Sequence, residues 1–316
     1  MQSYLNDMIN HKRVAILLCT YNGSEYLKKQ IDSIVEQTEK NWVIFASDDG
    51  SSDSTLDILN EYRTSLGYEK FNIVKGPGKG FAWNFLSLLE TCGEHFDYYA
   101  FCDQDDEWFP EKLETGISVL NYCELANPAV YCGRTQLVDE HNNDIGKSPL
   151  FKKPPSFKNA LIQSIAGGNT MMLNVSARNI VLKTPRYEKI ISHDWWVYII
   201  VTAVGGDIYY DPNPTIRYRQ HTGNIVGSNI GWFARFKRIS GLLDGHFKSW
   251  IDANLLALKK SNQELTYENR IILHDFEKAR TSGFFTRVNI FFKLGIYRQT
   301  FLGTLGLFVA ILFKKM

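Results

Sequence analysis

Residues 13–37 read RVAILLCTYNGSEYLKKQIDSIVEQ, and this stretch predicts a buried strand followed directly by a helix. The run from Arg13 to Thr20 is almost continuously apolar, which is typical of a strand covered on both faces. After it, apolar side chains recur at helical spacing, and Ser24 is the expected N-cap. The members of this helical stripe are Leu27, Ile31, Ile34 and Val35. A strand covered on both faces needs helices on both sides of its sheet.

The same strand-then-helix order repeats along the first third of the chain. The other predicted strands are NWVIFASDD (41–49), FNIVK (71–75) and YYAFCD (98–103), and the helices between them are SSDSTLDILNEY (51–62) and GFAWNFLSLLE (80–90). This alternation implies an α/β fold with a mainly parallel sheet flanked by helices. Ligands of such sheets bind beyond the carboxyl ends of the strands. Polar residues gather at each of those ends, at 20–22, 48–49, 75–76 and 103–106.

The composition indicates a globular protein of the cytoplasm. The 316 residues carry a net charge of +1, and 44% of them are hydrophobic, which is ample for a core. Five cysteines without a C-x-x-C pair favour reduced thiols, and the polar start MQSYLNDMINHKR does not read as a signal peptide.

The charge is unevenly distributed between two expected regions, residues 1–230 and a helical, basic and amphipathic region at 231–316. From Gly231 to Met316 there are 14 Lys and Arg against 6 Asp and Glu, a net +8, which leaves −7 for residues 1–230 out of the total +1. The longest uncharged run of this tail, Gln299 to Phe313, is shorter than the roughly 20 residues that span a bilayer. Two interpretations stay open: a segment lying on a membrane surface, or a helical cap packed on the first region.

The segment FCDQDDEWFPEKL, from Phe101 to Leu113, concentrates acidic residues between a predicted strand and a predicted helix. Asp103 and Asp105 flank one residue, so both can turn toward a common point. Hard oxygen ligands of this kind suit Mg²⁺ or Mn²⁺ beside phosphates. Helix capping is the alternative, because acids near a helix N-terminus are favourable. Capping explains Asp106 or Glu107 but not the acids on the strand side, so the segment favours a metal site.

Two further strand ends are ambiguous when taken alone. Asp48 and Asp49, in ASDDGSSDST, could hydrogen-bond a base or a ribose, or the stretch could be an ordinary turn. The stretch KGPGKGF (75–81) has three alternating glycines, but it lacks both the G-x-G-x-x-G spacing of dinucleotide sites and the G-K-[ST] of a P-loop.

Taken together, the motifs point to a family. AILLCTYNGSEYL, FASDDGSSDST, GKGFAWNF, FCDQDDEWFPEKL, AGGNTMML and SHDWW occur in one order, and in this combination the chain resembles glycosyltransferase family 2. That resemblance implies inverting nucleotide-sugar transfer on a Rossmann-like A-type fold. With YRQHTGN and KLGIYRQ included, the chain looks most like the bacterial rhamnosyltransferase branch. The resemblance covers roughly Arg13 to Asn229, so residues 1–230 would be the catalytic domain.

The resemblance also implies roles for particular residues. Asp194, in SHDWW, would be the general base, although local sequence leaves it open as an ordinary first-turn acid. The metal ligands would be Asp103, Asp105 and His221. Donor-binding residues would be Thr20, Tyr21, Asn22, Glu25, Asp48 and Asp49 at the base and ribose, Lys79, Gly80 and Asn84 along the nucleotide, Asp103, Gln104 and Asp106 at the diphosphate and sugar, and Gly167, Gly168 and Asn169 behind the sugar. The acceptor side would have His193, Trp195 and Trp196, although tryptophans are also common in cores.

These implied roles predict a reaction. The expected activity is inverting, metal-dependent and non-processive transfer of L-rhamnose from dTDP-L-rhamnose to a saccharide or lipid-linked saccharide, in synthesis of a bacterial surface polysaccharide. The enzyme would work at the cytoplasmic face of the membrane, with Mg²⁺ or Mn²⁺ and without nucleic acid. A UDP-hexose donor is one alternative, and a non-catalytic nucleotide-sugar-binding protein is another. A processive synthase would carry a Q-x-x-R-W motif and spanning helices, and the sequence has neither.

Overall fold

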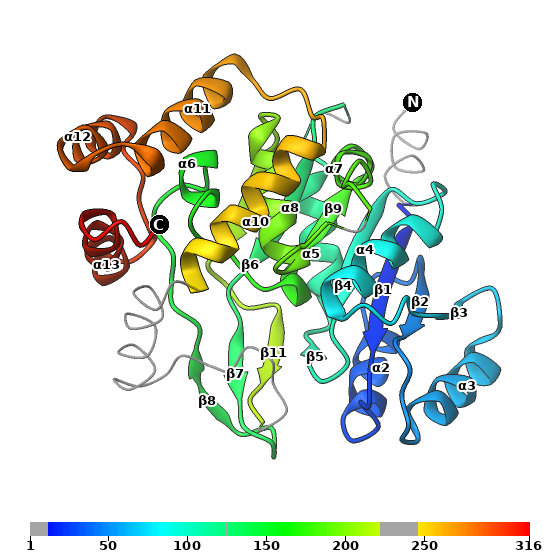
Figure 1. Cartoon of the computed structure of the whole chain (residues 1–316). Helices are drawn as coiled ribbons and strands as arrows, with labels where there is room; N and C mark the ends of the chain where they lie inside the picture. Colours follow the sequence, from blue (N-terminus) through cyan, green and yellow to red (C-terminus); the bar gives the residue numbers. More distant parts are fainter. Residues whose placement is uncertain (1–11, 124–125, 187, 222–245) are drawn as a thin grey trace.

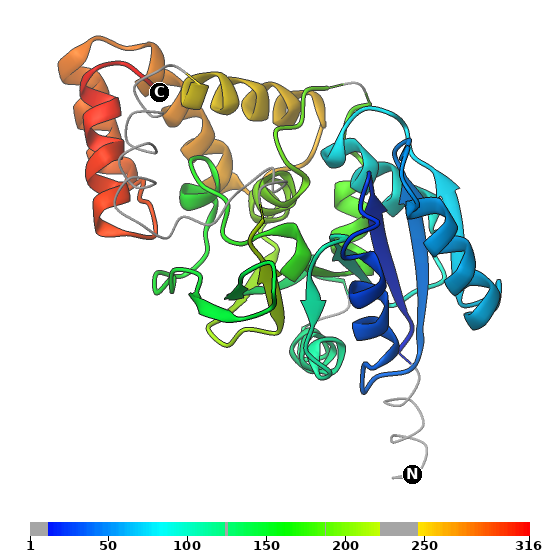
Figure 2. The same cartoon turned by 90° about the horizontal axis from the view of Figure 1, so that it is seen from below.

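Helices cover both faces of a central sheet, and a group of C-terminal helices lies at one side of it (Figure 1 and Figure 2). A smaller sheet projects from the central one at the edge where several loops meet (Figure 1). The computed structural model describes residues 12–123, 126–186, 188–221 and 246–316.

The central sheet has seven strands, in the order β10 (Asp207–Asp211), β6 (Ala129–Gly133), β9 (Met172–Asn174), β4 (Tyr98–Cys102), β1 (Val14–Thr20), β2 (Trp42–Asp48) and β3 (Phe71–Lys75). β4, β1, β2 and β3 run parallel, β10 is parallel to β6, and β9 is antiparallel to both of its neighbours. The four strands predicted from sequence are confirmed, and they form the parallel half of the sheet.

Strand β1 is buried along its whole length, and its side chains alternate between two cores. Ile16 and its like-facing neighbours pack against α2 (Leu27–Val35), α3 (Thr55–Leu66) and α5 (Lys112–Leu120). Leu17 faces the opposite core, which contains residues of α4 (Phe81–Thr91), α6 (Phe157–Ala160), α7 (Val175–Val181) and α8 (His193–Ala203). The prediction of helices on both faces is therefore confirmed.

The turn between β1 and α2 differs from the prediction. Helix α2 begins at Leu27 with Tyr26 at its N-cap, and no side chain bonds there, so Ser24 is not the cap. The Ser24 amide instead donates to Asp53 at 3.0 Å, and the Gly23 amide donates to Thr55 Oγ1 at 2.8 Å. The turn is thus held by the start of α3, about thirty residues further along the chain. The spacing of apolar residues in α2 cannot predict such a contact.

The smaller sheet is formed by β5 (Glu107–Trp108), β11 (Ile216–Arg219), β7 (Gln136–Val138) and β8 (Asp144–Lys147), in that order. β5 directly follows the acidic segment, and β11 pairs with it in antiparallel fashion. This pairing brings residues from near position 219 against the acidic segment, which local sequence patterns do not predict.

The C-terminal region consists of α10 (His246–Lys260), α11 (Tyr267–Thr281), α12 (Phe284–Leu294) and α13 (Phe301–Leu312). Ile251, Phe276 and Leu307 are fully buried in the same core as Trp196 of α8. Asn159 Nδ2 also donates to the carbonyl of Tyr297, between α12 and α13, at 3.0 Å. These helices pack as a cap on the rest of the fold.

The expected boundary at residue 230 lies outside the described residues. Across the parts of the chain that the structure describes, no helix combines the length and the apolar character needed to cross a bilayer.

Candidate active site

The loops after β1, β2 and β4 meet at the carboxyl edge of the central sheet. Gln104 joins two of them: its Oε1 accepts from the Tyr21 amide at 2.8 Å, and its Nε2 donates to the Tyr21 carbonyl at 3.1 Å. Gly23 permits this contact, because a Cβ there would lie 2.2 Å from Gln104 Oε1. The side chains of Tyr21, Glu25 and Lys79 are exposed at this edge, where a donor nucleotide is expected.

Asp48 shapes the loop after β2. Its buried carboxylate accepts from Thr20 Oγ1 at 2.9 Å and from the Ser51 amide at 2.9 Å. Asn22 has a left-handed backbone, with φ of 48°, and its Oδ1 accepts from the Ser52 amide at 2.8 Å. The resemblance implies donor contacts for Thr20, Asn22 and Asp48, whereas in this structure their side chains bond to the loops themselves.

Asp49 organises the glycine-rich stretch after β3. Its carboxylate accepts from the Gly78 amide at 2.6 Å and from the Gly80 amide at 3.2 Å, at the start of α4. Asn84, one turn into that helix, is buried and exchanges two hydrogen bonds with Ser47, of 2.5 and 3.1 Å. This amide therefore holds α4 against β2, and its place along the nucleotide stays a prediction from the resemblance.

Asp103 and Asp105 follow β4 and are both partly exposed. His221 lies beside them, with its Nε2 2.9 Å from Asp105 Oδ2. The pKa of Asp103 is raised to about 8, first because the surrounding protein removes its water and then because Asp105 and Asp194 lie near. Residues from three distant parts of the chain thus gather at one point.

This group can supply part of a metal site. Carboxylate oxygens suit Mg²⁺ and Mn²⁺, and Mn²⁺ also accepts an imidazole nitrogen such as that of His221. Within the described ranges, no three His, Cys, Asp or Glu side chains form a group that could hold a metal ion by themselves. A divalent ion at Asp103, Asp105 and His221 would therefore complete its ligands with water and with phosphate oxygens.

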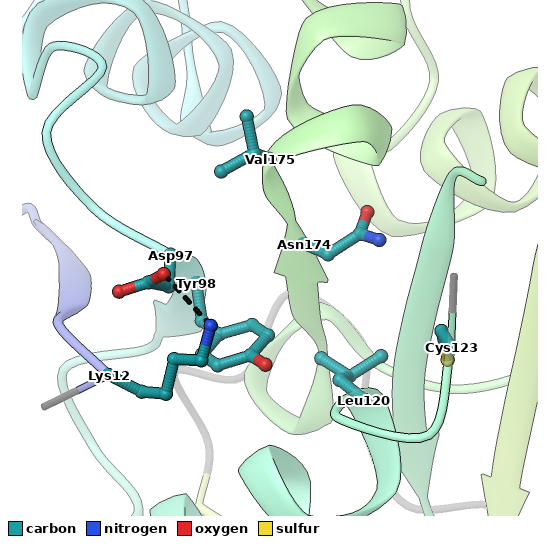
Figure 3. A pocket seen from close by; sticks show the side chains of 7 residues that line it. All are labelled: Lys12, Asp97, Tyr98, Leu120, Cys123, Asn174 and Val175. Carbon is teal, nitrogen blue, oxygen red and sulfur yellow. Dashed lines mark hydrogen bonds and ion pairs between the residues drawn. The ribbon is translucent and has the colours of Figure 1, made fainter. Parts of the chain in front are cut away.

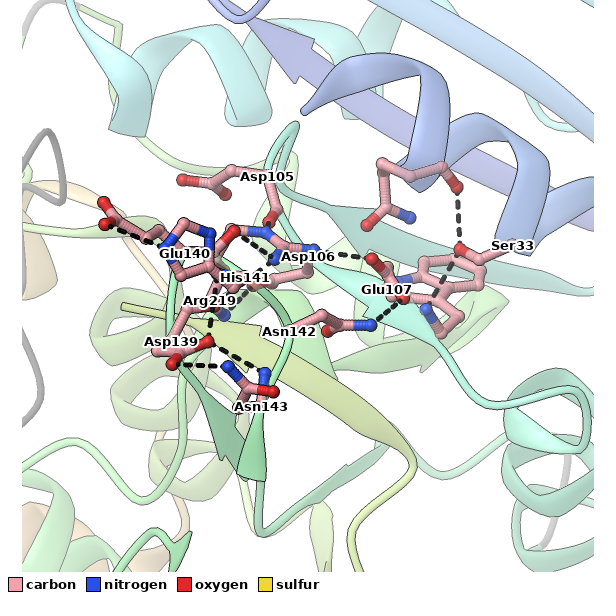
Figure 4. Close-up of polar contacts among 12 residues, drawn as sticks. Ser33, Asp105, Asp106, Glu107, Asp139, Glu140, His141, Asn142, Asn143 and Arg219 are labelled. Atoms are coloured by element: carbon pink, nitrogen blue, oxygen red, sulfur yellow. Dashed lines mark hydrogen bonds and ion pairs between the residues drawn. The ribbon is translucent and has the colours of Figure 1, made fainter. Parts of the chain in front are cut away.

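Arg219, which the sequence analysis missed, has no exposed surface and balances the charge of the acidic loop from the smaller sheet (Figure 4). Its guanidinium donates to the Asp105 carbonyl at 3.1 Å and to the Glu107 carboxylate at 2.5 Å. Its backbone amide donates to Asp106 Oδ1 at 3.3 Å. One residue thus contacts three consecutive members of the acidic loop.

Asp106 points inward and is fully buried. Its Oδ2 accepts from Asn169 Nδ2 at 2.6 Å. Asn169 lies in the 3₁₀ turn η1 (Gly168–Thr170), which the resemblance puts behind the donor sugar. The structure therefore joins the acidic loop to this turn through two residues that the sequence analysis had assigned separately to the donor.

His193 packs against the other side of the same turn. A Cβ on Gly168 would lie 2.0 Å from His193 Nε2, so only glycine fits at this position. The imidazole stacks on Phe85 with ring centroids 4.0 Å apart, and neither ring nitrogen has a hydrogen-bond partner among the described residues. Burial lowers the pKa of His193 to about 4, so the ring is neutral at physiological pH.

The structure buries the three side chains expected on the acceptor side. His193, Trp195 and Trp196 are all almost inaccessible to solvent. The indole of Trp195 donates to the Ala160 carbonyl and that of Trp196 to Thr184 Oγ1, each at 2.7 Å. The reason is that α8 is covered on nearly every side, so its aromatic residues fill the core.

Asp194, between His193 and Trp195, remains partly exposed. Its Oδ2 is 3.4 Å from Ser164 Oγ, and its charge contributes to the raised pKa of Asp103. A partly exposed carboxylate in this setting can accept a proton from a neighbouring hydroxyl group.

A small pocket at the opposite end of the sheet is separate from this site (Figure 3). It is lined by residues that include Lys12, Asp97 and Tyr98, and its volume is ≈ 40 Å³. That volume is close to the share of one water, about 30 Å³, and is too small for a nucleotide.

The sequence profile of glycosyl transferase family 2 matches residues 15–180, a range that runs from β1 through the acidic loop and the turn at Gly168. The chain belongs to this family. The glycosyltransferase is 32% identical over 232 residues to the dTDP-rhamnosyl transferase RfbG of Shigella flexneri, a match that covers 70% of this chain and 78% of the relative. It is 25% identical over 300 residues to the uncharacterized glycosyltransferase RT0329 of Rickettsia typhi, covering 91% and 82% of the two chains.

Solved structures share the fold of this family-2 enzyme. The crystal structure of S. aureus TarS 1-349 has a TM-score of 0.56 at 14% identity, over 89% of this chain and 72% of that one. The mannosyltransferase PcManGT from Pyrobaculum calidifontis, in complex with GDP-Man and Mn²⁺, has a TM-score of 0.52 at 14% identity, over 97% and 87%. The predicted α/β transferase fold is therefore confirmed.

Lys112 is a second cation of this family-2 site that the sequence analysis missed. It is the first residue of α5, is 1% exposed, and donates from Nζ to the Asn169 carbonyl at 3.1 Å. Arg219 lies in the stretch YRQH and Lys112 in the stretch FPEKL, beside polar or acidic residues. Their signal is weak because lysine and arginine are usually solvated.

The contact between Gly168 and His193 predicts a specific energetic coupling. Gly168→Ala should destabilise the protein by about 1–3 kcal/mol, because its methyl group would overlap the imidazole. In the His193→Ala background the same methyl group finds space. The double variant should therefore lose less unfolding free energy than the two single variants lose together. Urea unfolding of the four proteins measures this coupling. Gly283→Ala, where a Cβ meets nothing within 4 Å, is the control, and additive effects at 168 and 193 would contradict the prediction.

Proposed function

We propose that this glycosyltransferase is inverting, metal-dependent and non-processive, and that it moves L-rhamnose from dTDP-L-rhamnose to a saccharide or lipid-linked saccharide of a bacterial surface polysaccharide. The observation that carries the proposal is the convergence of Asp103, Asp105 and Asp194 at the carboxyl edge of the sheet. The choice of rhamnose is supported by the 32% identity to a protein named as a dTDP-rhamnosyl transferase.

The reaction needs charge stabilisation on one side of the sugar and a base on the other. Asp103, Asp105 and His221 would hold Mg²⁺ or Mn²⁺, which when bound supplies a Lewis acid for the departing diphosphate. Asp194 would accept the proton of the acceptor hydroxyl. A single displacement from the face opposite the leaving group inverts the anomeric carbon, and no covalent nucleophile is required.

A UDP-hexose donor is the second candidate. Neighbours with the same fold include TarS in complex with UDP-GlcNAc and a mannosyltransferase with GDP-Man, so this fold accommodates different bases and sugars. Turnover of dTDP-L-rhamnose and of UDP-hexoses, each with and without Mn²⁺, distinguishes the two candidates. A non-catalytic nucleotide-sugar-binding protein would bind a donor without any metal-dependent turnover.

Asp194→Asn should abolish transfer while preserving nucleotide binding. The amide cannot accept the proton, so we expect a loss of about 10²–10⁴-fold in kcat. The affinity for dTDP with Mn²⁺, measured by calorimetry, should stay within about twofold of wild type, because the residue would act on the acceptor side. Asp57→Asn changes the same type of first-turn acid on α3, away from the site, and is the control. Transfer at a near wild-type rate by Asp194→Asn would refute the assignment.

Mn²⁺ should stabilise the protein more at about pH 8 than at about pH 6. Burial and the charges of Asp105 and Asp194 raise the pKa of Asp103 to about 8, so the metal-free folded state holds a proton there. The stability that this proton contributes is present at low pH and is lost as the pH rises through about 8. A metal ion on Asp103 must displace the proton, so its apparent affinity should fall up to about tenfold per pH unit below that value.

Thermal unfolding with Mn²⁺ and with EDTA at both pH values measures this difference. Asp103→Asn should reduce the pH dependence, because it removes one of the groups that must lose a proton when the metal binds. An Mn²⁺ stabilisation of wild type that is equal at the two pH values would contradict the assignment of Asp103 as a metal ligand.

We also propose that α12 and α13 hold the enzyme against the cytoplasmic face of the membrane. One side of these helices is buried in the core, and the other exposes apolar side chains: Phe285 85%, Phe292 66%, Phe301 81% and Leu302 54%. Phe313, directly after α13, is 68% exposed. Residues 282–316 contain no Asp or Glu, and Lys293, Lys314 and Lys315 are exposed. An aromatic face with lysines around it fits an anionic lipid surface. A lipid-linked acceptor would lie in the same surface.

The triple variant Phe285→Ser, Phe292→Ser and Phe301→Ser should lose most of its binding to phosphatidylglycerol vesicles in a flotation assay, because it removes the largest exposed apolar side chains. Tyr68→Ser with Tyr122→Ser, at aromatic residues that are 70% and 91% exposed elsewhere, is the control and should bind as wild type does. Unchanged vesicle binding by the triple variant would refute the proposal. Self-association of wild type in light scattering that the variant loses would assign the face to a second copy instead.

A further inference from the structure

We infer that Lys112 is a positioning residue of this enzyme: it holds the Gly168–Thr170 turn against the acidic loop, so that the turn keeps a fixed place between the diphosphate side and Asp194. The inference rests on the proposed function, because it takes Asp194 as the base and the acidic loop as the diphosphate side. Lys112 acts through Asn169, and nothing in its contacts brings it to a substrate.

Lys112 is a buried cation with one well-defined acceptor. Its Nζ donates to the Asn169 carbonyl at 3.1 Å and lies 4.7 Å from the centroid of the Trp108 ring. Burial lowers its pKa to about 8, so the ammonium stays largely protonated at neutral pH. A buried charge is costly unless it is paired, which argues that this lysine is held in place by what it contacts.

Asn169 is held through its main chain and through its side chain. Its main-chain carbonyl accepts from Lys112, and its side-chain Nδ2 donates to Asp106 Oδ2 at 2.6 Å. Asp106 is in turn fixed by the amide of Arg219 at 3.3 Å. We call Lys112, Asp106 and Asn169 the clamp. It ties the turn to the acidic loop on one side, at a point that is almost fully buried.

The other side of the turn leads to the base. Gly168 lies directly against the His193 ring, and His193 precedes Asp194 in the first turn of α8. The His193 ring is surrounded by Phe81, Phe85 and Phe101. Because the turn leaves no space between Gly168 and this ring, a displacement of the turn toward α8 would press on His193 and on Asp194 next to it. A shift of about 1 Å in such an arrangement can cost about 10²-fold in rate.

The test compares Lys112→Met with Lys70→Met. Lys70 is a matched control: its Nζ lies 4.7 Å from the centroid of the Trp42 ring and donates to the carbonyls of Lys40 and Trp42, at 2.7 and 3.0 Å, but it lies at the opposite end of the sheet. In Lys112→Met we expect kcat for transfer from dTDP-L-rhamnose to fall about 10- to 100-fold. The affinity for dTDP with Mn²⁺ should change less than about threefold, because the nucleotide contacts are unaltered. Lys70→Met should keep the wild-type kcat.

Hydrogen exchange provides a readout that is independent of activity. The amides of Thr170 and Met171 close the turn by donating to Gly167 and Gly168, at 3.1 and 2.8 Å. They should exchange faster in Lys112→Met than in wild type, while the amides of β1 should be unchanged. If Lys112→Met does not fold, Lys112→Gln is measured in its place. Its side chain is one bond shorter, so its amide donor lies farther from the Asn169 main-chain carbonyl, and the same directions of change in kcat and in exchange are expected.

The outcomes separate this inference from the proposed function. A wild-type kcat in Lys112→Met, or a loss of nucleotide affinity as large as the loss of kcat, would overturn the positioning role. Unchanged exchange at Thr170 and Met171 would overturn it as well. If wild type itself shows no sugar transfer, the proposed function fails, and the exchange experiment still decides whether Lys112 holds the turn.

Discussion

A buried guanidinium holds the acidic loop in its shape. Four of the five residues from Asp103 to Glu107 are acids, and like charges this close repel one another. Arg219 reaches this loop from β11 and contacts a main-chain carbonyl of the loop as well as the Glu107 carboxylate, 112 residues away in sequence. It therefore fixes the path of the loop and not only its charge. Breaking such a buried pair typically costs about 3–5 kcal/mol, because one charge is left uncompensated.

Around this loop, the polar residues divide by what they bond to. Asp48, Asp49 and Asn84 bond to backbone groups of the loops or of neighbouring elements, and so tie the loops after β1, β2 and β3 together. Asp103, Asp105 and Asp194 are partly exposed beside them. Loops whose backbone groups are already paired lose less conformational freedom on binding, so the residues that brace the loops support the acids at the site.

The C-terminal helices show that two interpretations of one sequence can both have a structural basis. Phe276 and Leu307 belong to the main core, as a packed cap requires. Phe301, on the same helix α13 as Leu307, and Phe292, on α12, remain exposed, as a surface-lying segment requires. An amphipathic helix with apolar residues on more than one side can bury one of them and leave another for a second surface.

The sequence by itself determined the parallel half of the sheet, the helices around it, the edge at which the site lies and the family. Those features leave local signals: the unbroken apolar run of β1 records burial on both faces, and the acids after β4 record a strand end that a turn alone does not require. Only the tertiary structure decided that His193 and Trp196 belong to the core, that Asp106 points inward, and that Arg219 and Lys112 supply the cations. The physical reason is that burial of a polar side chain depends on partners far along the chain. The contact of Arg219 with Asp106 spans 113 residues, and no local spacing encodes it.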